Sequence, residues 1–94
     1  MSHVMIRLNL EDYAKWRSVF DEVAHLRESS GSHGGTLYRS ADDPHEVVIV
    51  WDWPDLAKAR SYFQSDVLRQ AMQRAGVQGR PDIVYLTAGE KIAL

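Results

Sequence analysis

The first side chains with clear chemical potential are Arg7 and Asn9, in an alternating segment, residues 3–10. Side chains of a strand alternate between its faces, so these two share one face if the segment is a strand. A guanidinium and an amide side by side can hold a carbonyl or stabilise an enolate as charge develops. Either Asn9 or Asp12 can instead cap the following helix, and Arg7 can form a salt bridge at an interface.

Aromatic residues form a second group with possible chemistry. Trp51 and Trp53 fall on one face of an expected strand, where their rings can stack on a planar substrate. Paired aromatic residues more often anchor a core or an interface. The hydroxyl groups of Tyr38, Tyr62 and Tyr85 can each donate a hydrogen bond to a bound oxygen, or simply lie at the surface.

The four histidines do not form a recognisable metal motif. His25 lies late in an expected helix, where it can interact with the helix dipole or face a pocket as a proton acceptor. The other three are expected at the surface, and no nucleophile elbow is present. We therefore expect no metal site.

The glycine- and serine-rich segment 29–35 is a possible phosphate cradle. Phosphate loops of that kind open a helix, whose free amide groups bind the anion. Here the residues that follow look like a strand, which favours a simple connector.

Hydrophobic periodicity predicts the elements that would position these residues. A period of two predicts strands, and a period near 3.6 predicts helices. Ser65 and Asp66 can interrupt and recap the second helical region, which leaves one bent helix or two. Residues 79–81 (Gly-Arg-Pro) read as a connector. The predicted order is strand, helix, strand, strand, helical region, strand, at residues 3–10, 11–28, 36–41, 46–53, 54–75 and 82–87.

This order predicts an α+β, ferredoxin-like βαββαβ fold with a four-stranded antiparallel sheet, in one domain over residues 1–94. Helices would cover one face of the sheet only. The strand at 46–53 is nevertheless apolar on both faces, with Val47, Ile49 and Trp51 opposite Val48 and Val50. A second copy of the chain is the simplest cover, and residues 91–94 are apolar enough to lie on it.

Composition excludes several classes of function. The net charge is −2, which gives no electrostatic reason to expect a nucleic-acid partner. No apolar run approaches the roughly 20 residues of a membrane span, and the N-terminus lacks the layout of a signal peptide. Cysteine is absent, so thiolate chemistry is excluded. A cytoplasmic protein is the default expectation.

Several short motifs together resemble the antibiotic biosynthesis monooxygenase-like branch of the dimeric α+β barrel superfamily. The resemblance implies a homodimer whose two sheets face each other as a barrel, with a pocket between each sheet and its helices. The motifs are Val4-Met5-Ile6-Arg7, Asp12-Tyr13-Ala14-Lys15-Trp16, Phe20-Asp21-Glu22, Asp42-Asp43-Pro44, Val47-Val48-Ile49-Val50-Trp51 and Phe63-Gln64-Ser65-Asp66-Val67-Leu68.

The resemblance also implies candidate site residues. Haem-degrading members carry a tryptophan and a histidine where this chain has Tyr62 and Met72, so an axial imidazole is missing and no cofactor is expected. Quinone-forming members use tryptophan, asparagine, arginine and tyrosine in the pocket. The candidate catalytic residues are accordingly Arg7, Asn9, Trp51 and Tyr62, and the candidate substrate-binding residues are His25, Tyr38, Trp53 and Met72.

Two functions follow as expectations. The first is a cofactor-independent monooxygenase, or a related isomerase, acting on a small aromatic or polyketide-like molecule. The second is a non-catalytic dimeric domain that binds a small hydrophobic ligand or serves as an accessory. The second stays open because the sequence contains no strong catalytic signature.

Overall fold

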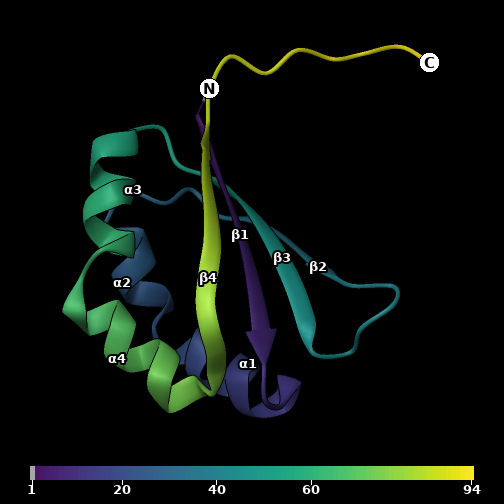
Figure 1. Cartoon of the computed structure of the whole chain (residues 1–94). Coiled ribbons are helices and arrows are strands. Elements are labelled where there is room, and N and C mark those ends of the chain that lie inside the picture. The colour runs from purple at the N-terminus through teal and green to yellow at the C-terminus, as the bar shows by residue number, and fades with distance from the viewer. Residues whose placement is uncertain (1) are drawn as a thin grey trace.

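The computed structural model describes residues 2–94, and it shows one antiparallel sheet with every helix on the same face (Figure 1). The strand order is β2-β3-β1-β4. Strands β1 (His3–Leu10) and β3 (Glu46–Asp52) are central, whereas β2 (Gly35–Arg39) and β4 (Val77–Leu86) form the edges. The predicted α+β, ferredoxin-like architecture is confirmed.

Each predicted helical region consists of two helices: α1 (Tyr13–Glu22) and α2 (Ala24–Ser29), then α3 (Leu56–Phe63) and α4 (Asp66–Ala75). The expectation of a single helix over 11–28 is therefore wrong. The break is at Val23, whose φ of −97° and ψ of 13° leave the helical geometry. Val23 is itself buried, so the apolar stripe continues across the break. The helical period of the sequence therefore gives no sign of the break.

Side chains at the helix starts explain where the helices begin. The Asp12 carboxylate accepts a hydrogen bond from the Lys15 amide at 2.8 Å and caps α1, so of the two predicted caps Asp12 is confirmed and Asn9 is wrong. Asp55 caps α3 in the same way, which places Pro54 before the helix and not in its first turn. The predicted recapping at Ser65 is confirmed, because its hydroxyl accepts from the Leu68 amide at 3.3 Å.

The last strand is longer than the sequence suggested. Gly76 ends α4 in the left-handed conformation, with φ of +81°, and β4 begins at the next residue. The expected connector at residues 79–81 is part of this strand. Its register against β1 shifts between Arg7 and Asn9, which marks a bulge. Pro81 has no backbone N–H to donate. It is tolerated there because a bulge in an edge strand leaves a residue outside the hydrogen-bonded ladder.

The pairing register decides which side chains reach the helices. Val4 is opposite Trp51, and Ile6 is opposite Ile49, so these four share the helix-covered face. Trp51 and Trp53 are also buried on the helix-covered face.

Residues 87–94 extend away from the sheet in Figure 1. None of the helices within residues 2–94 is long and apolar enough to cross a bilayer.

The opposite face of the sheet has no cover within this chain, and we call it the open face. It carries an apolar group in which Val84 and Leu86 are 41% and 38% exposed. Five residues, two of them half-buried on β3, form this group: Met5, Val48, Val50, Val84 and Leu86.

Candidate active site

A cavity of about 50 Å³ lies between the helix-covered face of the sheet and the helices. Its walls are almost wholly apolar, and Arg27 is the one charged residue among them. The walls comprise Ile6, Leu8, Ile49 and Trp51 from the strands, Trp16, Val19, Phe20, Val23 and Arg27 from the first helical region, and Tyr62, Phe63, Leu68, Ala71, Met72 and Ala75 from the second.

One wall of the cavity is built from aromatic rings. Phe20 lies between Trp16 and Trp51, with ring centroids at 4.6 and 5.8 Å. The Phe20 and Trp51 rings stack on each other, with planes that differ by 28°, so they form one packed aromatic wall of the cavity.

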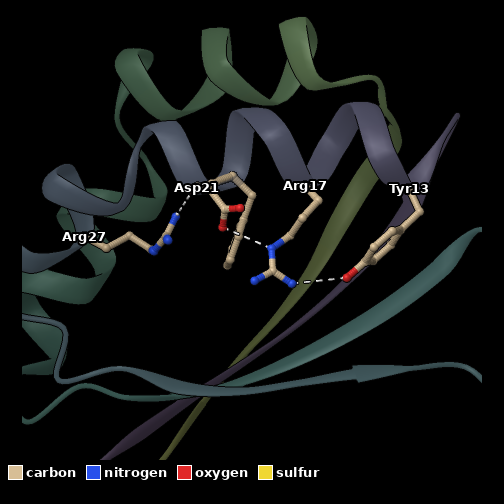
Figure 2. A network of polar contacts seen from close by, with 5 residues as sticks. Tyr13, Arg17, Asp21 and Arg27 are labelled. Carbon is tan, nitrogen blue, oxygen red and sulfur yellow. Dashed lines mark hydrogen bonds and ion pairs between the residues drawn. The ribbon is translucent and has the colours of Figure 1, made fainter.

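Arg27 lies beside this aromatic wall, and Figure 2 shows its guanidinium directed toward the neighbouring helix. Its Nη1 donates a hydrogen bond to the Phe20 carbonyl at 2.9 Å, and its guanidinium carbon lies 4.0 Å from the Phe20 ring centroid and 5.1 Å from that of Trp51. Within residues 2–94 no carboxylate forms an ion pair with Arg27. Burial lowers the pKa of Arg27 below its ordinary value, but an arginine stays charged near neutral pH.

Tyr62 supplies the hydroxyl group of the cavity. Burial raises its pKa above 10, and the Arg27 charge opposes this shift in part. The phenol is therefore neutral at pH 7 and can donate or accept a hydrogen bond. Tyr62 also borders a wider and more polar groove of about 600 Å³, lined by Leu26, Ser29, Ser30, Ala57, Lys58, Ser61, Ser65 and Val67. Tyr62 is thus a shared wall of the cavity and the groove.

A model of the antibiotic biosynthesis monooxygenase family matches residues 1–74. The chain belongs to this family. A search of curated proteins gives no match.

Solved structures of this monooxygenase family share the fold. SnoaB, a cofactor-independent oxygenase from Streptomyces nogalater, is 19% identical, with 97% of this chain and 95% of that chain covered and a TM-score of 0.75. The monooxygenase ActVA-Orf6 of Streptomyces coelicolor, solved in complex with nanaomycin D, is 20% identical, with coverages of 99% and 91% and a TM-score of 0.67. Rv0793 from Mycobacterium tuberculosis is 14% identical, with 98% of this chain and 98% of that chain covered and a TM-score of 0.69.

The four predicted catalytic residues do not form one site in this member of the monooxygenase family. Trp51 and Tyr62 both line the cavity, whereas Arg7 and Asn9 are exposed on the open face. Arg7 is opposite Val48 in the register and donates from Nε to Asp82 at 3.0 Å. Arg7 and Trp51 project from opposite sides of the sheet, so these four residues do not converge in this structure.

The four predicted substrate-binding residues also separate. Met72 lines the cavity. Trp53 is buried behind the wall, with its indole nitrogen donating to the Ser30 carbonyl at 3.0 Å. His25 is exposed, with Nδ1 3.1 Å from the Glu22 carbonyl, and Tyr38 is 55% exposed on the open face. The cavity therefore contains only Met72 of these four.

Sequence reasoning missed Arg27, Trp16 and Phe20 as members of the cavity. Trp16, Phe20, Val23 and Arg27 follow one another at steps of three and four residues, which places all four on one stripe of the helical region. An arginine that continues an apolar stripe was the available signal. Within residues 2–94 no three histidine, aspartate or glutamate side chains gather as metal ligands.

Proposed function

We propose that this protein is a cofactor-independent monooxygenase that acts on a small, flat aromatic molecule. The observation that carries the proposal is the apolar cavity, with its aromatic Phe20–Trp51 wall and its two polar side chains, Arg27 and Tyr62. Membership of the antibiotic biosynthesis monooxygenase family supports it, and SnoaB, which shares the fold, is a cofactor-independent oxygenase.

The chemistry without a cofactor requires the substrate to supply the electrons. A CH₂ group flanked by aromatic rings loses a proton, and its carbanion reduces O₂. One oxygen atom then enters the product as a carbonyl group, and the other leaves as water. Arg27 and Tyr62 would stabilise the enolate form of that anion, because fixed donors in an apolar cavity act strongly on developing charge.

The size of the cavity limits the substrate or requires a movement. An engineered cavity that binds benzene measures about 150 Å³, so a space of about 50 Å³ does not admit a fused ring system as it stands. Met72 is the most adaptable wall residue, because its thioether chain has three rotatable bonds. A displacement of Met72 would enlarge the space next to the aromatic wall.

Oxygen uptake with an anthrone-like phenol tests the activity. We expect Tyr62→Phe and Arg27→Gln each to lower kcat by about 10- to 100-fold. Arg7→Ala and Asn9→Ala, both outside the cavity, should leave turnover near wild type. Loss of turnover in these two variants, with Tyr62→Phe and Arg27→Gln active, would move the chemistry to the open face. No oxygen uptake by the wild type with a panel of such phenols would contradict the proposal.

A non-catalytic binding domain is the second candidate. The small volume of the cavity favours it, since side chains already fill most of the space between helices and sheet. Calorimetry with the same phenols separates the two functions. Binding without oxygen uptake would support the second candidate.

We also infer a homodimer through the open face. The apolar group on this face (Met5, Val48, Val50, Val84 and Leu86) is flanked by the ion pair Arg7–Asp82 and by the polar side chains of His3 and Asp52. An apolar centre with a polar rim is the usual composition of an interface. Residues 91–94 would be free to lie against the second copy.

Light scattering tests the dimer at concentrations of about 1 to 100 µM. Val84→Asp places a charge in the apolar group and should give a monomer. Val67→Asp is the matched control, because this valine is 58% exposed on α4, away from the sheet. A monomer mass for the wild-type protein over this range would rule out the interface.

A further inference from the structure

We propose that the cavity selects flat ligands that carry a negative charge, and that Arg27 is the residue responsible for this selection. The ligand class is an aromatic carboxylate or phenolate, with its ring among the apolar walls of the cavity and its anionic oxygen at the guanidinium. The inference rests on the proposed use of the cavity as the ligand site, enlarged by the displacement of Met72.

The first argument is the charge balance inside the cavity. Its lining residues include one cation, Arg27, and no carboxylate. A half-buried charge is costly unless partners compensate for lost hydration. The Phe20 and Trp51 rings and one carbonyl provide part of that compensation. An arginine carries five N–H donors, so donors remain for an anionic ligand.

The second argument is that the nearest acid is already engaged. Asp21 accepts a hydrogen bond from Nε of Arg17 at 3.0 Å, and Nη1 of Arg17 also donates to the Tyr13 hydroxyl at 3.3 Å (Figure 2). Asp21 therefore pairs with Arg17, one turn before it on α1, and not with Arg27. The charge of Asp21 still acts on Arg27, but its carboxylate does not pair with the guanidinium that borders the cavity.

Calorimetry with a size-matched pair of ligands tests the selection. We use 2-naphthoate and 2-naphthamide, which differ in charge and not in ring size. Wild type should bind the acid about 10-fold or more tightly than the amide, because a charged hydrogen bond is stronger than a neutral one. Arg27→Gln should abolish this preference, and Arg27→Lys should retain part of it.

Arg60→Gln is the control variant. Arg60 also lies over an aromatic ring, 4.1 Å from the Tyr85 centroid, but it is outside the cavity. Its removal should leave the preference for the acid unchanged. Thermal melts of each variant show whether it folds, and the wild-type comparison holds even if Arg27→Gln does not.

Three results would overturn the inference: equal wild-type affinities for the two ligands, a preference that survives Arg27→Gln, or no binding of either ligand at about 1 mM. The proposed oxygenase activity is judged separately, since neither naphthalene ligand has a CH₂ group to oxidise. Oxygen uptake without a preference for the acid would refute the anion selection alone.

Discussion

The two faces of the sheet are built from the same strands, but the helices cover only one of them. On the helix-covered face, Val4, Ile6, Leu8 and Leu10 are all buried, and Trp51 closes the cavity. On the open face, charged and polar side chains surround valines that remain partly exposed. Alternation along a strand therefore separates the cavity from the open face by a single residue step.

This comparison explains why residue type alone combined the wrong side chains. Arg7 and Asn9 are chemically suited to an oxyanion, and so is Tyr62, but only Tyr62 lies on the covered face. Arg27 replaces Arg7 as the guanidinium of the cavity. The polar groups of the cavity, Arg27 and Tyr62, thus come from α2 and α3, and its aromatic wall comes from β3 and α1.

The largest expected effect concerns space on the covered face. A Cβ added at Gly35 would lie 2.4 Å from the Val50 carbonyl oxygen and 2.8 Å from the Trp51 Cα. Gly35→Ala must therefore separate β2 from β3, and we expect a loss of about 3 kcal/mol in the free energy of unfolding. Gly89→Ala is the control, because nothing lies within 4 Å of its added Cβ. Urea denaturation measures both, and equal midpoints would show that β2 accommodates the methyl group.

A pair of neighbouring valines compares the faces directly. Val47 is fully buried under the helices, whereas Val48 is half-buried on the open face. Val47→Ala should cost about 2 kcal/mol, from lost transfer energy and a cavity. Val48→Ala should cost less than about 1 kcal/mol at low protein concentration.

The concentration dependence of the Val48→Ala effect sharpens the comparison. If a second copy covers the open face, unfolding midpoints rise with protein concentration, and Val48→Ala weakens this rise. Val47→Ala should shift the midpoint equally at about 1 and 100 µM. Equal losses for the two variants at both concentrations would mean that the faces do not differ as described.

Much of the fold could be predicted from hydrophobic period, because alternation and helical stripes record which side of each element is buried. The strand order followed from the βαββαβ pattern. The break at Val23 could not be predicted, since its apolar stripe is uninterrupted. Gly79 and Pro81 were interpreted as a connector because glycine and proline are typical both of turns and of bulges in edge strands.

The candidate site was predictable only in part, for a different reason. Alternation shows which residues of one strand share a face, but it does not fix the phase between strands. The pairing of Arg7 with Val48, and not with its neighbours, is set by register. Arg27 was missed because arginine usually marks a solvated position, whereas here its stem and guanidinium pack on aromatic rings.

The smallest effect expected is a pH dependence that separates buried Tyr62 from exposed Tyr38. Burial raises the pKa of Tyr62 above its ordinary value of 10. Above pH 10 the unfolded chain therefore loses this proton before the folded chain does, so stability falls as pH rises from 10 towards the folded pKa. Tyr62→Phe removes this contribution and should flatten the decline, whereas Tyr38→Phe should leave it as in wild type. Urea midpoints between about pH 9 and 11 measure the slope. An unchanged slope in Tyr62→Phe would mean that its hydroxyl is hydrated, and hence that the cavity is not the dry site the proposed chemistry needs.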